Sequence, residues 1–422
     1  MWLNETLRRY HTKHRLVALA IWMIVIAQSG TVGAEQPRFS RYLFVWTGDQ
    51  DRHDSDFLAV LNTDPQSSDY GRVLQTVPVN ARGTNPHHTE HFLTPGHPLF
   101  AEGFTGNRAF RFDVSHPLAP KLLGDVAQSP GATFIHSFVR LPNGNVLATM
   151  QARDPEYNGP GGLVEFRDDG TVVRSASAAT EDVDDNLMRP YSLLVVPDKD
   201  RVVVTDALMG LQSWSEHSEH YDHEHVGFHV QLWRLSDLRL LKTITLAAPE
   251  GSKLNLRPFE PRQLPNGEVL LATGTGGLYR VLGLEPETFT AQLVYDFECP
   301  QSSGTPLVVG HFWIQPLGGR NSVVVLDVSN PAEPIEVSRV RLDDKQRPHW
   351  LAYDPLGERI IVQGGADNRL WMLTFSPRSG ALALDPRFRD PGSNRAGVSF
   401  EREQWLHGPS GNAIPHGSVF AD

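Results

Sequence analysis

The sequence predicts an all-β fold, a seven-bladed β-propeller whose ring is closed by a C-terminal strand. The first observation is a recurring phrase, in which an apolar strand runs into a Pro/Gly turn and a second β-branched strand follows, as in RPHWLAYDPLGERIIV from Arg347. The second is a connection that occurs twice, DVSHPLAP from Asp113 and DVSNPAEP from Asp327. The third is a single strand left over near the C-terminus, around residues 415–420.

The recurring phrase keeps its turn but changes one residue. Further copies start at Phe134, Arg189 and Arg257, with a looser copy from Pro86. When the copies are aligned on the turn proline, the residue six places earlier is Thr89, His136, Tyr191, Phe259 or His349. A constant turn with a variable residue at the strand entrance indicates a radial array with a site at its centre.

The expected strands follow the chain in blade order. Blade one takes residues 42–49, 56–64 and 72–79, and blade two takes 88–94, 98–104, 108–115 and 121–126. Blade three runs from Phe134 through 161–166 and 171–178, blade four from Arg189 through 229–237 and 239–246, and blade five from Arg257 to 291–297. Blade six contains 311–317, 322–329 and 334–342, and blade seven runs from Arg347 through 369–376.

Ring closure explains the uneven strand count. The first blade has three strands, so the leftover C-terminal strand is expected to become its innermost one. The two Asp-Val-Ser connections fit the link between the third and fourth strands of a blade. Two β-sandwiches in tandem are the alternative, but they leave the repetition of the phrase through the whole chain unexplained.

Composition excludes several classes of protein. The chain has 422 residues, 40% of them hydrophobic, and its 36 Gly and 31 Pro are spread in short turns, as expected of a repeat protein with a large core. A formal net charge of -11 and the lack of a basic stripe argue against a nucleic-acid partner. No G-x-S-x-G elbow, P-loop or dinucleotide fingerprint occurs. The one cysteine, Cys299, forms no internal disulfide and is expected to be buried and inert.

The N-terminal stretch is typical of a secretory signal peptide. Basic residues precede an apolar run over residues 16–27, and small residues lead to a cleavage site after Ala34. We therefore expect residues 1–34 to be removed, residues 35–422 to form a single propeller domain, and the protein to be periplasmic or secreted, without stable membrane insertion after cleavage. An uncleaved anchor is the alternative, although the run is shorter than the ~20 residues of a membrane span.

Histidines at the strand entrances indicate a metal site. The first strand of each blade lines the central channel, so His88, His136 and His349 are expected to converge, with His416 added by the closing strand. Neutral imidazole nitrogen is a common ligand of copper, zinc and iron. Glu260, in RPFEPR, is a candidate to orient a ligating histidine or to act as a base, and Tyr191 is a candidate donor behind the ligands.

Other readings of these histidines stay open. Any one of them alone fits a hydrogen-bonded structural residue, and spacing does not decide which of His87, His88 and His91 faces the axis. The segment from Ser215 to His229 holds five of the 18 histidines among acidic residues. Such a tract either captures metal ions loosely or is a solvated loop, and it lacks the fixed spacing of a structural zinc site.

Several of these stretches resemble the selenium-binding proteins, a family that includes the methanethiol oxidases. The similarity lies in DFLAVLNTDPQSSDYGRVLQTVPV with the paired histidines after it, FIHSFVRLPNGNVLAT, HVQLWRLSDLRLLKTITL, PFEPRQLPNGEV and the stretch from Arg347. The resemblance implies a seven-bladed propeller, exported in bacteria, that uses copper to oxidise methanethiol with oxygen to formaldehyde, hydrogen sulfide and hydrogen peroxide. It implies that His88, His136, His349 and His416 lie near the metal, with Glu260 beside them.

The chain departs from the family in one place. A Cys-x-x-Cys segment is expected just after the paired histidines, but residues 92–104 read FLTPGHPLFAEGF. The resemblance therefore does not carry selenium binding or activity on methanethiol across by itself.

Two functions follow from these observations. The first is an exported copper oxidase of methanethiol or another small thiol, with another transition metal as the variant. The second is a non-catalytic propeller that binds metal or presents a face to a protein partner. A propeller lactonase is a third, but it needs a site richer in Asp, Asn and Glu than these entrances supply.

Overall fold

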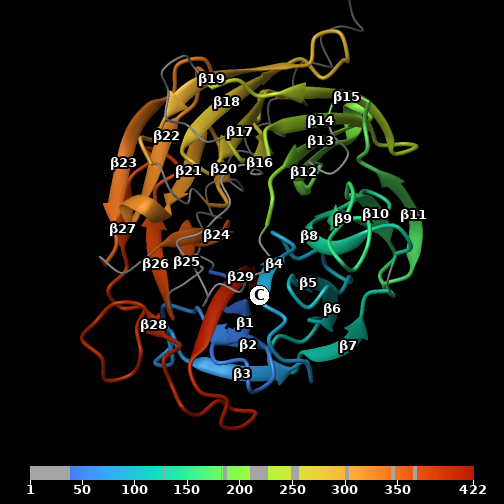
Figure 1. The fold of residues 1–422 in the computed structure, drawn as a ribbon. Coiled ribbons are helices and arrows are strands. Elements are labelled where there is room, and N and C mark those ends of the chain that lie inside the picture. The colour runs from blue at the N-terminus through green and yellow to red at the C-terminus, as the bar shows by residue number, and fades with distance from the viewer. Residues whose placement is uncertain are drawn as a thin grey trace, which may run out of the picture. The chain divides into compact units, whose positions relative to one another are not determined.

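The computed structural model describes residues 39–127, 129–181, 183, 188–209, 227–248, 256–299, 304–343, 347–364 and 368–422. Over these residues the chain is almost entirely β-structure, with two short 3₁₀ turns at Pro197–Lys199 and Gly318–Arg320. Seven antiparallel sheets stand in a ring around a common centre (Figure 1). The predicted all-β propeller with seven blades is confirmed. Among the described residues, no helix is long and apolar enough to cross a membrane.

The first four blades span the N-terminal half of the ring. Blade one contains β1 (Tyr42–Asp49), β2 (Phe57–Asn62) and β3 (Val73–Pro78). Blade two contains β4 (Pro86–Thr89), β5 (Leu99–Gly103), β6 (Arg108–Asp113) and β7 (Lys121–Asp125). Blade three contains β8 (Thr133–Arg140), β9 (Val146–Ala152), β10 (Gly162–Phe166) and β11 (Val172–Ser177). Blade four contains β12 (Pro190–Val196), β13 (Arg201–Asp206), β14 (His229–Arg234) and β15 (Arg239–Thr245).

The last three blades complete the ring. Blade five contains β16 (Pro258–Gln263), β17 (Val269–Thr273), β18 (Gly277–Leu282) and β19 (Thr290–Asp296). Blade six contains β20 (Leu307–Val309), β21 (Phe312–Leu317), β22 (Ser322–Asp327) and β23 (Ile335–Arg341). Blade seven contains β24 (Pro348–Asp354), β25 (Arg359–Gly364), β26 (Arg369–Phe375) and β27 (Leu382–Leu384), and β28 (Val398–Ser399) also pairs with β26.

The C-terminal strand closes the ring as predicted. Strand β29 (Ala413–Ala421) is the innermost strand of blade one and pairs antiparallel with β1, from Tyr42 opposite Ala421 to Asp49 opposite Ala413. In Figure 1 the red β29 lies beside the blue β1. The indole nitrogen of Trp350 on β24 donates to the carbonyl of Ser418 at 3.0 Å, which ties blade seven to this strand. Closure leaves no long sheet edge on the inside of the ring.

The strand boundaries differ from the prediction most clearly in blade two, and in blade six the short inner strand β20 was not predicted. The inner strand of blade two was expected over residues 88–94, but β4 ends at Thr89. The next residue, Glu90, turns its carboxylate to the Arg140 guanidinium on blade three, with Oε2 2.8 Å from Nη2. The prolines at 95 and 98 cannot donate ladder hydrogen bonds, so residues 91–98 form a loop rather than strand.

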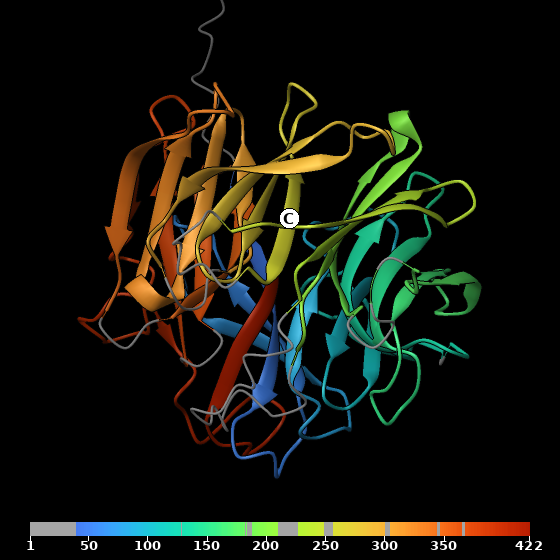
Figure 2. The same ribbon diagram turned by 45° about the horizontal axis from the view of Figure 1, so that its top comes forward.

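The apolar core lies between neighbouring blades. Blades one and two share a cluster that includes Phe44, Trp46 and Phe110, and blades six and seven share one that includes Ile314 and Leu351. Burial of each large side chain stabilises the fold by about 1.5–3 kcal/mol. Cys299 is buried between blades five and six, as expected. Figure 2 shows the same sheets tilted, standing side by side around the ring.

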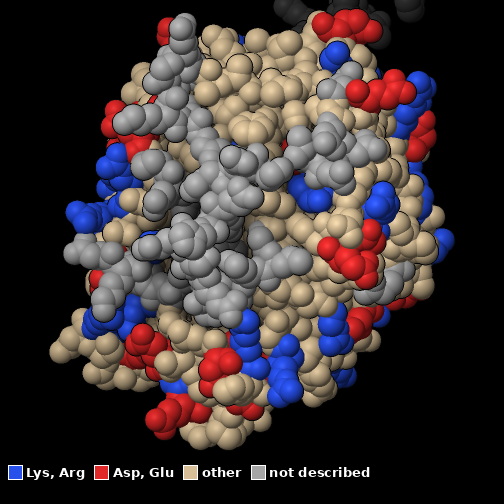
Figure 3. Space-filling view, viewed as in Figure 1, with Lys and Arg blue, Asp and Glu red and all other residues tan. Residues whose placement is uncertain are grey.

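The surface carries both signs of charge. On the face seen in Figure 3, Lys and Arg side chains are interspersed with Asp and Glu around the edge, and no side of the ring belongs to one sign.

Candidate metal centre

The inner strands carry a β-bulge at the repeat position that the turn alignment singled out. In blade three His136 and Ser137 together oppose the single residue Thr149, and in blade four Tyr191 and Ser192 oppose Thr205. Register shifts occur at the same level in β4, β16, β24 and β29. A bulge re-aims a side chain that the normal alternation would direct elsewhere.

Side chains on the neighbouring strand satisfy the backbone of the bulges. The Thr149 hydroxyl accepts from the Ser137 N–H at 3.0 Å and donates to the Tyr191 carbonyl at 2.8 Å. In blade two the carboxylate of Glu102 plays the equivalent part, because its Oε1 accepts from the His88 N–H at 3.0 Å. Since an unpaired buried amide is costly, these contacts hold the bulges in one conformation.

Five imidazoles meet inside the ring. They are His87, His88, His136, His349 and His416, and their exposed fractions are all 6% or less. One nitrogen from each of His87, His349 and His416 lies within 4.8 Å of the other two, and the same holds for His87, His88 and His136. The structure thus brings together all four histidines predicted from the sequence and adds His87.

Hydrogen bonds fix the orientation of the rings. His136 Nδ1 lies 2.7 Å from the Tyr191 carbonyl, and His416 Nδ1 lies 2.8 Å from the His87 carbonyl. A carbonyl oxygen can only accept, so in both rings Nδ1 carries the proton and Nε2 presents its lone pair. His87 Nδ1 is 3.0 Å from Glu102 Oε1, and His88 Nδ1 is 3.0 Å from the Ser137 hydroxyl. Outer partners of this kind are typical of metal-ligating histidines.

Four of the five imidazoles, those of His87, His88, His136 and His416, have pKa values far below physiological pH and are therefore neutral. Burial lowers the pKa of His136 to about 3, and burial together with repulsion from neighbouring imidazolium groups places the pKa values of His87, His88 and His416 well below the ordinary value. Burial also raises the pKa of Glu102 well above its usual range. Neutral imidazole is the form that binds metal.

The donor set fits a transition-metal ion. The Nε2 atoms of His88 and His136 are buried and have no hydrogen-bond partner within the described part of the chain. A buried polar atom without a partner is costly, and a cation in the centre would satisfy both atoms. A cluster of imidazoles without a nearby ring of oxygens suits copper, zinc or iron rather than calcium or magnesium.

Among the described residues, no hydrogen bond joins Glu260 to a histidine of the cluster, and Tyr191 contacts the cluster through its backbone carbonyl. Glu260 is fully buried, and its Oε2 accepts from the Ser192 hydroxyl at 2.7 Å and from Arg262 at 2.8 Å. The histidine-bound carboxylate that the structure describes is Glu102. Tyr191 contributes its backbone carbonyl to His136, while its ring stacks on Phe259 with centroids 4.3 Å apart.

His91 lies outside the cluster. Its ring is stacked on Trp350, with centroids 4.6 Å apart and planes at 6°, and its Nε2 accepts from Arg262 at 3.2 Å. Trp350 in turn lies 5.0 Å from His88, centroid to centroid. Of the three candidates near residue 88, two therefore face the centre and the third lies behind Trp350.

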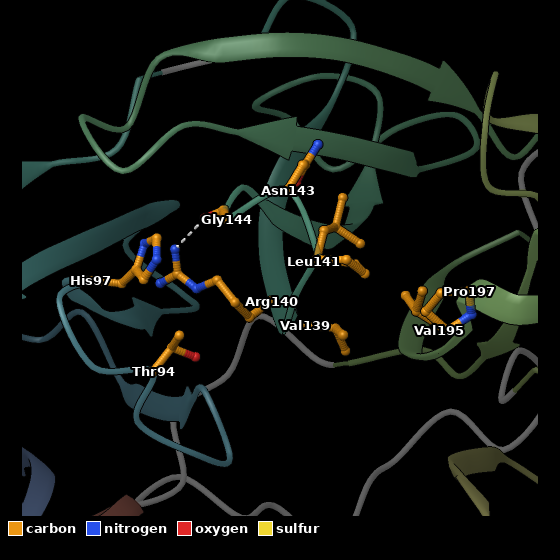
Figure 4. Close-up of a pocket in the computed structure, with 10 residues that line it drawn as sticks. Thr94, His97, Val139, Arg140, Leu141, Asn143, Gly144, Val195 and Pro197 are labelled. Carbon is orange, nitrogen blue, oxygen red and sulfur yellow. Dashed lines mark hydrogen bonds between the residues drawn. The ribbon is translucent and has the colours of Figure 1, made fainter.

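A second polar cluster lies near the turn end of β8, in a pocket of about 600 Å³ (Figure 4). His97 Nδ1 is 2.7 Å from an Asp168 oxygen. All five N–H donors of Arg140 are engaged, by Glu90, Asp168 and the carbonyls of Gly144 and Pro98. Because the guanidinium has no donor left for a ligand, this network joins blades two and three rather than forming an anion site.

The histidine-rich segment falls mostly outside the described residues, which resume at Gly227. Its last member, His229, begins β14 and is buried, with Nδ1 3.2 Å from the Thr245 hydroxyl. The predicted signal peptide, residues 1–34, also lies outside the described residues.

Sequence reasoning missed Glu102 and left His87 undecided. Glu102 sits in β5, within PLFAEGF, and a carboxylate in an otherwise apolar buried strand is a signal that was present in the sequence. His87 could not be assigned because a bulge changes the residue count between the turn and the axis.

Known proteins share both the fold and part of the sequence. No family model matches the chain. It is 28% identical over 366 residues to a methanethiol oxidase of Hyphomicrobium sp. The alignment covers 79% of this chain and 80% of that protein. The chain is 33% identical over 152 residues to a methanethiol oxidase of Ruegeria pomeroyi, 33% of each chain. A solved structure, a hypothetical selenium-binding protein from Sulfolobus tokodaii, superposes with a TM-score of 0.70 at 16% identity and covers 91% of this chain and 94% of its own.

Proposed function

We propose that this chain, a relative of the selenium-binding proteins and methanethiol oxidases, is an exported copper-dependent oxidase of methanethiol or another small thiol. The observation that carries the proposal is the buried cluster of five imidazoles, in which the Nε2 atoms of His88 and His136 are buried without a hydrogen-bond partner among the described residues. The relatives support the choice of a thiol as substrate, since two of them are methanethiol oxidases. Export rests on the basic and apolar pattern of residues 1–34.

His87, His88, His136, His349 and His416 are the residues that would hold the metal. Copper bound there supplies one-electron redox chemistry and a Lewis-acidic position for a thiol sulfur. The chain's contribution is to bury the imidazoles, which favours their neutral form, and to orient them. The Tyr191 and His87 carbonyls orient His136 and His416, and Glu102 and Ser137 orient His87 and His88.

Glu260 is the candidate base for the thiol proton. Its Oε2 is held by Ser192 and Arg262, but Oε1 is buried and has no hydrogen-bond partner among the described residues. Burial raises the pKa of Glu260, although the neighbouring Arg262 opposes the rise. A carboxylate with a raised pKa and an unused oxygen can take the proton from a thiol S–H and leave a thiolate.

Oxygen uptake tests the proposal. Purified protein reconstituted with copper is expected to consume oxygen on addition of methanethiol, and Glu260→Gln is expected to slow uptake by about 10²-fold or more with bound copper unchanged. Glu285→Gln, at an exposed ion pair with Arg201, is the matched control and should keep the wild-type rate. A copper-loaded protein that consumes no oxygen with any small thiol would instead support a metal-binding propeller without catalysis.

A further inference from the structure

The five clustered imidazoles fall into two groups that share His87. In the first group, His87, His88 and His136, the ring centroids lie 4.1, 4.4 and 4.8 Å apart. In the second group, His87, His349 and His416, they lie 4.2, 5.0 and 5.7 Å apart. Between the groups the distances are larger, since His88 lies 6.0 Å from His416 and 6.5 Å from His349.

A single ion cannot reach all five rings in this arrangement. Imidazole nitrogen binds an ion such as zinc at about 2.0–2.1 Å, so two nitrogens on one ion lie at most about 4.2 Å apart. Within each group the three nitrogens lie within 4.8 Å of one another, a distance that small side-chain shifts reduce to this limit, whereas the five nitrogens together do not meet that condition. Each group by itself supplies three ligands and leaves an open coordination position.

His87 can serve only one group at a time. Its Nδ1 lies 3.0 Å from Glu102 Oε1, so a metal binds this ring through Nε2. Two cations held a few ångströms apart in a buried site also repel each other strongly. The geometry therefore favours one ion per chain with two places to bind.

Different contacts hold the two groups in place. In the first group the Ser137 hydroxyl lies 3.0 Å from His88 Nδ1 and 3.1 Å from His136 Nδ1. In the second group His416 Nδ1 lies 2.8 Å from the His87 carbonyl. The two groups can therefore be perturbed separately.

We propose that the cluster consists of two overlapping three-histidine sites that share His87, and that one copper ion occupies either site. The inference rests on the proposed function for the identity of the metal, and it deepens that function by assigning the ligands of each position. Loss of the other two histidines of one group leaves a complete site, whereas loss of His87 leaves none.

Pairs of substitutions test this division at a constant number of ligands. His349→Ala with His416→Ala keeps the first group, and His88→Ala with His136→Ala keeps the second. After reconstitution, each within-group pair is expected to retain about one copper ion per chain by mass spectrometry. The matched control, His136→Ala with His349→Ala, also keeps three histidines but breaks both groups. It should retain at most about a tenth as much, since even loss of an outer partner weakens metal affinity about 10- to 100-fold. A folded within-group variant that binds no more copper than the control would overturn the proposal.

Electron paramagnetic resonance tests the same point on the wild-type protein, so the result does not depend on the folding of a variant. The Cu(II) form is expected to show coupling to the imidazole nitrogens of one group of three. Coupling of one copper ion to four or more imidazole nitrogens would show that the ion binds across both groups, and the division would be wrong.

Ser137→Ala tests the separate support of the first group. With His349→Ala and His416→Ala present, it is expected to weaken copper affinity about 10-fold or more. With His88→Ala and His136→Ala present, both imidazole partners of the hydroxyl are gone, so copper affinity should stay the same. Equal losses in the two backgrounds would contradict the assignment.

The two proposals fail in different ways. If the within-group variants keep copper but no thiol causes oxygen uptake in the wild type, the oxidase function fails and the two overlapping sites stand. If methanethiol is oxidised but the within-group variants lose copper as the control does, the division fails and the oxidase function stands.

Discussion

At the scale of single residues, His87 is the centre of the proposed metal site. Among the described histidines it is the one that belongs to both groups of three. Its carbonyl also accepts from His416 Nδ1, so it acts at the same time as a candidate ligand and as a support for its neighbour. The turn-based alignment predicted His136 and His349 directly and His88 as the neighbour of Thr89, and the closing strand added His416. It could not resolve His87, because adjacent residues in a bulge face the same side and break the alternation on which the alignment depends.

Asp206 gives a residue-scale prediction about pH. Its Oδ1 accepts from the Arg189 N–H, and burial raises the pKa of the carboxyl to about 7 against an ordinary value of 3.8. Between about pH 4 and pH 7 the unfolded chain loses this proton and the folded chain keeps it, so the wild type loses stability as pH rises. Relative to Asp206→Asn, the loss should be about 1.4 kcal/mol per pH unit over that window, with no further change above about pH 7.

Urea unfolding at pH 5, 6, 7 and 8 measures this difference. Asp237→Asn, at an exposed carboxylate beside Arg234, is the control. If the curves for wild type and Asp206→Asn stay parallel across the range, Asp206 titrates normally in the folded state.

At the scale of elements, the β-bulge that recurs in the inner strands re-aims side chains that are candidate metal ligands. Five of the seven inner strands run into a turn with a proline at a fixed place in the sequence, which is why blade number, strand order and ring closure could be predicted. The bulge has no such signature, since it is defined by pairing with the next strand. The role of Glu102 and the early end of β4 at Thr89 depend on cross-strand contacts of the same kind.

Thr149→Val tests whether the bulge holds the site. The substitution keeps the shape of the side chain but removes the hydroxyl that serves the Ser137 N–H and the Tyr191 carbonyl. We expect a loss of about 1–3 kcal/mol in the free energy of unfolding and about 10- to 100-fold weaker copper affinity. Thr374→Val, at an exposed position whose hydroxyl donates to the Ala383 carbonyl, should change stability by less than about 0.5 kcal/mol. If Thr149→Val binds copper as tightly as the wild type, the hydrogen bonds that support the bulge do not contribute to metal binding.

At the scale of the whole molecule, the site depends on ring closure. The five imidazoles come from blades one, two, three and seven, and blade one contributes through a strand from the other end of the chain. A buried ion pair supports the same junction, because Asp354 of blade seven accepts from Arg359 and from the Ser40 hydroxyl that precedes β1. Arg359 also donates to the Thr63 carbonyl after β2.

Asp354→Ala is therefore expected to destabilise the propeller strongly. Removal of the carboxylate leaves the Arg359 guanidinium, 4% exposed, without its charge partner, at a cost of about 3–5 kcal/mol in the free energy of unfolding. Arg339→Ala, at a partly exposed pair with Glu336, should cost no more than about 1 kcal/mol. Equal midpoints for the two variants in urea unfolding would show that the junction contributes no more than a surface pair.

The central claim is that the converging histidines bind a metal, and metal content tests it most directly. Mass spectrometry should find about one copper ion per chain in protein reconstituted with copper, and none in a folded variant with both His136→Ala and His349→Ala, since each of the two histidine groups then lacks a member. Circular dichroism confirms that the variant keeps its β-structure. Wild-type protein that takes up no copper, or a double variant that keeps full occupancy, would contradict the account.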